Sequence, residues 1–298
     1  MPKLRSFAAL SPFANFNADP AFPWSQLTEL SLKSHSSIPQ FLEACTNLTT
    51  LHVSIELDSR YPEGSPFSTI HEGLQAFTVS FAQRDDRSDH KDIVAKVLNQ
   101  LSFPNLVSYA LTGFIDRSGN NLQILSLTDL YIFDTDLTAI LQKVPSVVEL
   151  TLGDCRLDKK NLPEDVEEDE AVNEEDSHST VSSALLKSLH AFRRPDARSA
   201  DPNPILPNLR RLYLHVFAEF DGDVFRETIT SRWIPSEDYA EELGVKCLQK
   251  VELHLGDERY PVFDVSSILN QTFTLKSFRK QGMIVDIICS GHYLDVYH

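Results

Sequence analysis

The stretch Leu209-Arg210-Arg211-Leu212-Tyr213-Leu214 decides the fold, because its apolar residues stand at the first, fourth and sixth positions. The same apolar-x-x-apolar-x-apolar unit recurs on both sides of this stretch. Its copies, given by their three apolar positions, are Leu27/Leu30/Leu32, Leu48/Leu51/Val53, Leu74/Phe77/Val79, Leu106/Tyr109/Leu111, Leu122/Leu125/Leu127, Val147/Leu150/Leu152, Leu209/Leu212/Leu214 and Leu248/Val251/Leu253. Weaker copies flank them, Leu4/Phe7/Ala9 and Leu275 with Phe278. One repeat therefore organises the chain.

Each copy is expected to form a strand, because its last two apolar positions are two residues apart, the period of a strand with one buried face. Residues 38–44, 93–101, 137–144 and 185–192 have helical spacing instead. One such unit cannot bury its apolar edge alone, so neighbouring units must stack. The pattern predicts an α/β fold: an irregular leucine-rich-repeat solenoid, with a parallel sheet on its concave face and helices or extended returns on its convex face.

The repeat predicts one leucine-rich-repeat domain over residues 1–298. Residues 163–180 interrupt it, and their core, residues 164–176, reads EDVEEDEAVNEED. Like charges in such a run repel one another and bury no apolar surface. We expect an acidic, disordered insertion within the domain.

Composition excludes several classes of function. The net charge of −16 would repel the phosphates of a nucleic acid. No run of 18 apolar residues occurs, which excludes a predicted membrane span, and no signal peptide is recognisable. The four cysteines are far apart, unlike those of small secreted scaffolds, so a reducing compartment is expected. The predicted location is the cytoplasm or the nucleus.

Catalytic and cofactor signatures are missing from the sequence. It has no phosphate-binding loop and no dinucleotide fingerprint. Cys289 and His292 form a single Cys-x-x-His pair, whereas a structural zinc site needs four ligands. Cys155 beside Asp154 suggests a thiol with an acid, but proximity in sequence does not make a catalytic pair. We expect no enzyme activity, no metal and no cofactor.

Side chains alternate along a strand, so the residues between the buried apolar ones point to the exposed face of the sheet. This face is the predicted binding surface for another protein. Arg211 and Tyr213 are its preferred anchors, because arginine and tyrosine are enriched at binding hot spots. The candidate partner-binding residues are Glu29, Lys33, Thr50, His52, Ile124, Glu149, Arg211, Tyr213, His215, Lys250, Glu252 and His254.

The run from Phe22 to Leu32, FPWSQLTELSL, followed by irregular repeats, resembles the leucine-rich-repeat region of fungal (basidiomycete-type) F-box proteins. The resemblance implies a substrate receptor of a ubiquitin ligase, in which an F-box module binds an Skp1-type adaptor. Residues from Met1 to Ala9 already look like the end of a repeat, so we expect this chain to lack the module. An Skp1-type adaptor is then an expected partner only if an F-box exists upstream.

Three functions stay open on the sequence alone. The first is a substrate-recognition-like scaffold that binds an unknown protein through the exposed face. The second is an acidic leucine-rich-repeat protein that binds basic partners such as histones through residues 164–176. The third is a structural scaffold or a non-catalytic remnant of an expanded family.

Overall fold

The computed structural model describes residues 4–9, 22–33, 41, 43–56, 73–82, 115, 121–128, 132, 134–154, 181–192, 204–217, 221–256, 277–289 and 292–293. The predicted insertion at 163–180, the predicted helix at 93–101 and the unit starting at Leu106 lie outside these residues. So do the side chains of Lys33, Cys289 and His292, although their backbone belongs to strands.

The described residues form one ten-stranded sheet whose strands follow one another in chain order. Its strands are β1 (Ser6–Ala9), β2 (Glu29–Lys33), β3 (Thr50–Glu56), β4 (Ala76–Ala82), β5 (Ile124–Thr128), β6 (Glu149–Gly153), β7 (Arg211–Val216), β8 (Lys250–Leu255), β9 (Ile284–Cys289) and β10 (His292–Tyr293). All neighbours pair in parallel except β10, which turns back antiparallel on β9. The predicted α/β class with a parallel sheet is confirmed.

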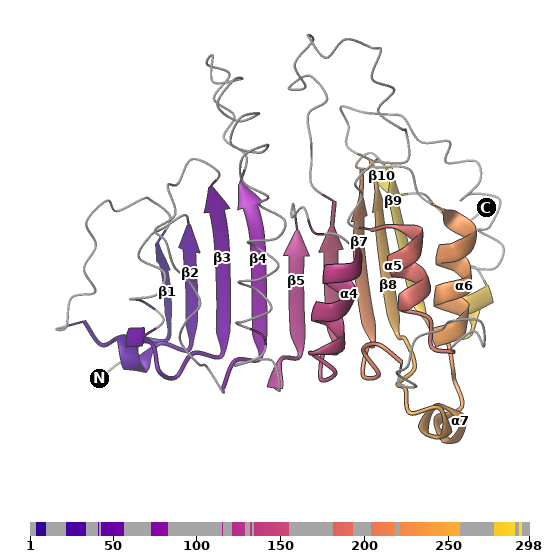
Figure 1. Cartoon of the computed structure of the whole chain (residues 1–298), viewed down its shortest axis with the longest axis horizontal. Coiled ribbons are helices and arrows are strands. Elements are labelled where there is room, and N and C mark those ends of the chain that lie inside the picture. The colour runs from indigo at the N-terminus through magenta and orange to yellow at the C-terminus, as the bar shows by residue number, and fades with distance from the viewer. Residues whose placement is uncertain are drawn as a thin grey trace, which may run out of the picture.

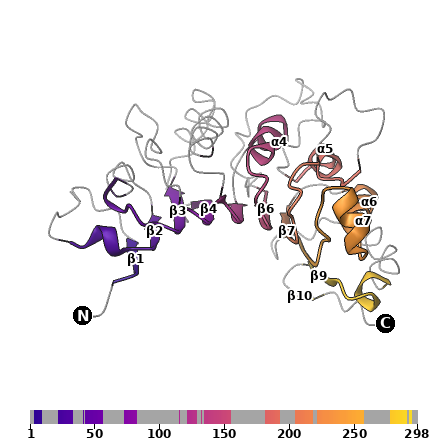
Figure 2. The ribbon, with the colours of Figure 1, turned by 90° about the horizontal axis from the view of Figure 1, so that it is seen from below.

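Three helices, α4 (Asp134–Gln142), α5 (Ser183–Ser188) and α6 (Gly222–Arg232), lie over one face of the sheet (Figures 1 and 2). Helix α7 (Glu237–Glu242) lies beyond the ends of the strands in Figure 1, and a 3-10 turn, η1, spans Trp24–Gln26. Figure 2 shows the row of strands as an arc, with α4, α5 and α6 on its outer side. The opposite face is therefore concave and carries none of the described helices.

The apolar residues of successive units stack in register across the sheet. Leu30 pairs with Leu51, which pairs with Phe77, and the same row continues through Leu150 to Leu212. Each of these side chains is fully buried. The burial predicted for the three apolar positions is confirmed in every strong unit that the structure describes, and these residues form one continuous core.

The strands from β2 to β8 each begin with the same backbone contact to the unit before them. The carbonyl of Thr28 accepts the N–H groups of both Thr49 and Thr50, and the carbonyl of Val148 accepts those of Arg210 and Arg211. Side chains just before the first apolar position reinforce this link across units. Asn47 donates to the Ser25 carbonyl, Ser146 to that of Leu122 and Asn208 to that of Pro145, at 2.7–3.0 Å.

Strands β4 and β5 are direct neighbours in the sheet, with Ala76 opposite Ile124 and Phe77 opposite Leu125. The predicted unit starting at Leu106 belongs to the connection between them, which lies outside the described residues. That this unit forms a strand therefore stays a prediction.

The C-terminal part differs from the prediction. Phe278, expected in a weak strand unit, lies in a helical turn at 277–280, and the strand follows it as β9. Helices α6 and α7 were not predicted, although Asp221 and Ser236 cap them by accepting backbone N–H groups. The helix predicted over 185–192 is shorter, since α5 ends at Ser188.

Two buried polar residues close the longest connection, between β6 and β7. Asp154 is 2% exposed and accepts the N–H groups of Val181 and Phe217 at 2.9 and 3.0 Å. Arg232, at the end of α6, is 0% exposed and donates to the carbonyls of Leu189, Ile205 and Leu206. Both side chains satisfy backbone groups from segments far apart in sequence.

No described helix is long and apolar enough to cross a membrane.

Candidate functional site

The exposed sheet face consists of three rows of side chains that run across the strands. The described register places Glu29, Thr50, Ala76, Ile124, Glu149, Arg211, Lys250 and Ile284 in the first row, Ser31, His52, Thr78, Ser126, Thr151, Tyr213, Glu252 and Asp286 in the second, and Ser54, Ser80, Thr128, His215, His254 and Ile288 in the third. On β6 the third row is interrupted by Gly153, which is buried and has no side chain. Apart from Gly153, the alternation predicted from the sequence is confirmed, because the face residues of β5 to β8 alternate with buried leucines and valines.

The face changes character along the sheet. From β2 to β5 it carries mostly small hydroxyl side chains, such as Ser54, Thr78 and Ser126, and Thr151 continues them on β6. From β6 to β9 it carries charged, aromatic and imidazole groups. The candidate residues thus fall into two sets: Glu29, Thr50, His52 and Ile124 on β2 to β5, and Glu149, Arg211, Tyr213, His215, Lys250, Glu252 and His254 on β6 to β8.

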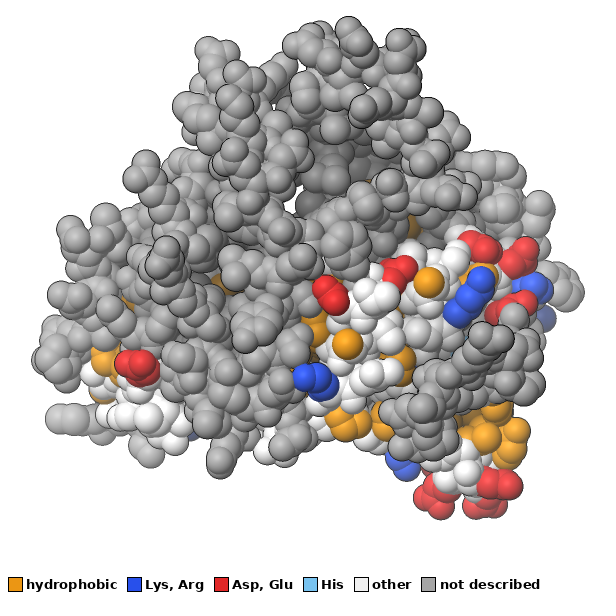
Figure 3. All heavy atoms as spheres, viewed as in Figure 1, with side chains coloured by type: hydrophobic (Ala, Val, Ile, Leu, Met, Phe, Trp, Pro, Cys, Tyr) orange, Lys and Arg blue, Asp and Glu red, His pale blue; other side chains and the backbone are white. Residues whose placement is uncertain are grey.

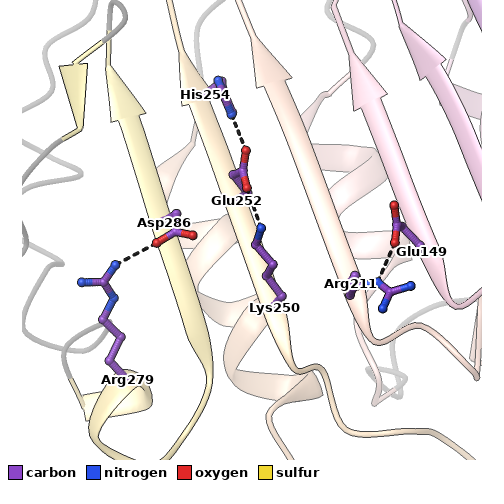
Figure 4. Close-up of polar contacts among 7 residues, drawn as sticks. All are labelled: Glu149, Arg211, Lys250, Glu252, His254, Arg279 and Asp286. Carbon is purple, nitrogen blue, oxygen red and sulfur yellow. Dashed lines mark hydrogen bonds and ion pairs between the residues drawn. The ribbon is translucent and has the colours of Figure 1, made fainter.

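Ion pairs connect the second set (Figure 4). Arg211 Nε lies 2.5 Å from Glu149 Oε2 on the neighbouring strand β6. On β8, Glu252 is the common acceptor, with Lys250 Nζ 2.8 Å from Oε2 and His254 Nε2 2.7 Å from Oε1. Carboxylates and cations therefore alternate on this part of the face.

The electrostatic environment favours the charged forms of Lys250 and Glu252. The hydrogen bond to Glu252 raises the pKa of the Lys250 ammonium above its usual 10.5, against the opposing effect of burial. Burial alone would raise the pKa of the Glu252 carboxyl, but the hydrogen bonds from His254 and Lys250 outweigh it and hold that pKa below 4.5. Both groups are charged at neutral pH.

Ring contacts order the same region. Lys250 Nζ lies 4.9 Å from the centroid of the Tyr213 ring, a cation–π contact. The imidazoles of His215 and His254 are stacked, with centroids 4.5 Å apart and an interplanar angle of 15°. These contacts hold the side chains of β7 and β8 in fixed positions, which lowers the entropy that binding would cost.

The sequence pattern did not reveal the last part of the face, which β9 supplies. Ile284 is 53% exposed, the largest exposed fraction among the described large hydrophobic residues. Asp286 lies 2.9 Å from Arg279, which also donates to the Val285 carbonyl. The alternation within Ile284-Val285-Asp286-Ile287 signals a strand, but the copy expected at Leu275 and Phe278 had been placed just before it.

Acidic side chains also gather on the helix side of the molecule, at α7 (Figure 3). Glu237, Asp238, Glu241 and Glu242 are all exposed there. On the concave face, by contrast, the described carboxylates of Glu149, Glu252 and Asp286 each have a cationic or imidazole neighbour. The four carboxylates of α7 therefore lie away from this face.

The described residues offer no catalytic constellation. His254 and Glu252 form a base–acid pair, but their register neighbours on β7 and β9 include neither Ser nor Cys. Burial raises the pKa of the Cys45 thiol to about 11 and also raises that of Cys247, so neither is an activated thiolate at neutral pH. Asp154, suggested as a partner of Cys155, is occupied by two backbone N–H groups.

No group of three or more His, Cys, Asp or Glu residues in the described segments is placed to hold a metal ion. Comparison with known proteins adds no assignment: no protein-family model matches the chain, and no curated protein does so either.

Proposed function

We propose that this chain is a leucine-rich-repeat solenoid that binds another protein on its concave sheet face and catalyses no reaction. The single observation that carries the proposal is the concave face itself, which lies opposite the described helices and bears ordered anchor side chains over β6 to β9. Stacked repeats create extended concave surfaces of this kind, which repeat proteins use for binding.

Repetition supports the solenoid assignment. The apolar positions of one unit pair with the same positions of the next. At each strand from β2 to β8, two N–H groups donate to one carbonyl of the preceding unit. Each unit thus contacts mainly its neighbours, as in repeat proteins. Connections of very different length, from β2–β3 to β6–β7, make the solenoid irregular.

Size and composition support a protein partner. Ten strands at a spacing of about 4.8 Å make a strip roughly 43 Å long, which suits a protein surface or an extended peptide better than a metabolite. Tyr213 and Arg211 are residue types enriched at binding hot spots. The hydroxyl side chains from β2 to β5 would allow a partner to approach closely.

The resemblance to F-box receptors suggests which partner to look for first. In such a receptor the repeats would hold the substrate of a ubiquitin ligase, and this chain would contribute the same recognition step. An adaptor of the Skp1 type would join only through an F-box.

Arginine substitutions on the two faces test the proposal. Thr78→Arg and Ser126→Arg each place a long cation in the middle row of the concave face, whereas Ala139→Arg on α4 and Ala184→Arg on α5 add the same side chain to exposed positions on the helix side. The intact chain and each variant are used to purify partners from native cells, with mass spectrometry as the readout.

We expect partners of the intact chain to be lost with Thr78→Arg and Ser126→Arg and kept with Ala139→Arg and Ala184→Arg. Equal recovery with all four variants would refute binding on the concave face. Loss of partners only on deletion of residues 164–176 would favour the acidic-binder alternative instead.

A further inference from the structure

Two cations stand side by side at the centre of the charged part of the face. Arg211 on β7 and Lys250 on β8 are direct register partners, and both side chains belong to the first exposed row. Like charges opposite each other destabilise a sheet. Each cation is offset by one carboxylate, Glu149 for Arg211 and Glu252 for Lys250 (Figure 4).

Hydrogen-bond donors remain available on both cations. Arg211 is 43% exposed and uses only Nε, for Glu149, so within the described part of the chain its two terminal nitrogens donate to no acceptor. A guanidinium carries five N–H donors in a planar fork, and the edge formed by its terminal nitrogens fits a second carboxylate. Lys250 has three N–H donors, of which the described contacts occupy one with Glu252.

Each carboxylate on this part of the face already has a donor. Glu149 accepts from Arg211, Glu252 accepts from both Lys250 and His254, and Asp286 accepts from Arg279. The terminal nitrogens of Arg211 and two N–H groups of Lys250 thus remain as donors beside carboxylates that already have a cationic partner. Its complement is an acceptor that carries negative charge.

We propose that the sheet face binds an acidic segment of its protein partner, with one Asp or Glu carboxylate of that segment seated between Arg211 and Lys250. This inference rests on the proposed function. The carboxylate accepts two N–H groups from the terminal nitrogens of Arg211 and one from the Lys250 ammonium. Tyr213, whose ring lies under Lys250, holds that ammonium in place.

A carboxylate fits this seat better than a phosphoryl group. Glu149 and Glu252 already neutralise much of the charge of the two cations. A phosphoryl group carries about two negative charges at neutral pH and would face both glutamates at short range. A carboxylate carries a single negative charge, so the two glutamates repel it less. A basic segment would be repelled by Arg211 and Lys250.

Selection from a random peptide library displayed on phage tests the inference without a known partner. The full chain is immobilised, and the selected peptides are then synthesised and their dissociation constants measured. We expect the peptides to share an Asp or Glu at one position, and Arg211→Gln or Lys250→Gln to weaken their binding about tenfold. The matched control Lys187→Gln, an exposed cation on α5, is expected to leave binding unchanged.

Exchanging the shared acid in the peptide supplies the second arm. Replacement by Asn or Gln is expected to weaken binding about tenfold to the intact chain and to have little further effect on Arg211→Gln, because the two changes remove the same contact. A phosphoserine in its place is expected to bind more weakly. Tighter binding of the phosphoserine peptide would assign the seat to a phosphoryl group and overturn the proposal.

The other outcomes separate the inference from the proposed function. Neutral or basic peptides, or none, would overturn the inference. Peptides that lose affinity for Thr78→Arg and Ser126→Arg but keep it for Arg211→Gln would retain the face as a binding surface and refute its acidic specificity. Peptides that bind all of these variants equally would refute both, and circular dichroism of each variant checks that the fold is kept.

Discussion

Replacing Arg232 by methionine perturbs the fold at its most deeply buried charge. The Arg232 side chain is 0% exposed and donates hydrogen bonds to the carbonyls of Leu189, Ile205 and Leu206. No carboxylate bonds to it among the described contacts. Arg232→Met keeps much of the apolar stem and removes both the charge and the donors.

Two effects of this substitution oppose each other. Burial lowers the pKa of the Arg232 guanidinium from 12.5 to about 10, and at roughly 1.4 kcal/mol per pKa unit the buried charge costs about 3 kcal/mol, which methionine would recover. The three carbonyls would lose their donors, at about 2 kcal/mol each for a buried polar group left unpaired. The unpaired carbonyls decide the sign, so we expect the free energy of unfolding to fall by about 3 kcal/mol.

Urea unfolding followed by circular dichroism measures this difference, and hydrogen exchange locates it. We expect faster amide exchange in α5, α6 and β7, which Arg232 connects, and unchanged exchange in β2 to β4. A variant as stable as the intact chain, or more stable, would refute the reasoning, because it would mean that the carbonyls do not depend on Arg232.

Three further predictions concern stability. Asp154→Ala leaves the N–H groups of Val181 and Phe217 without their acceptor. It should lower the free energy of unfolding by about 2–4 kcal/mol, measured by urea titration. A change below about 0.5 kcal/mol would contradict the view that Asp154 stabilises the fold by accepting these two groups. Leu150→Ala, at a fully buried position, should lower the free energy of unfolding by about 2–5 kcal/mol. Thr151→Ala, at the neighbouring position on the other face of the sheet, should lower it by less than about 0.5 kcal/mol. Similar losses for the two variants would contradict the assignment of these residues to opposite faces. The Lys250–Glu252 pair should contribute its full stabilisation between about pH 4.5 and 10.5. This contribution is lost as the pH falls below 4.5 through the lowered pKa of Glu252, and as the pH rises above 10.5 through the raised pKa of Lys250. Glu252→Gln should flatten the stability profile at acid pH, and an unchanged profile would exclude the pair.

Local periodicity was enough to predict the sheet and its buried positions. Each unit repeats the same spacing of apolar residues, and stacking leaves only one register in which Leu30, Leu51 and Phe77 can share a core. The exposed alternation then places Arg211 and Lys250 on one face. Both results depend on residues a few positions apart, which a sequence displays directly.

Other features depend on contacts between distant segments, and spacing does not reveal them. Arg232 looks like an ordinary cation at a helix end, and its burial depends on the carbonyls of Leu189, Ile205 and Leu206, which lie far from it in the sequence. Phe278 was expected in a strand unit, yet it lies in a helical turn at 277–280 and strand β9 follows it. The spacing within one unit does not show where its strand begins.

Site-specific photo-crosslinking can show which face of the sheet binds the partner protein. A photoreactive phenylalanine analogue is placed at Ser126, on the concave face, and in a matched variant at Ala184, on the exposed side of α5, and both chains are irradiated in native cells. If the concave face binds the partner, we expect crosslinks to a partner protein from Ser126 and none to that protein from Ala184. Crosslinks from Ala184 alone, or equally from both positions, would contradict binding on the concave face.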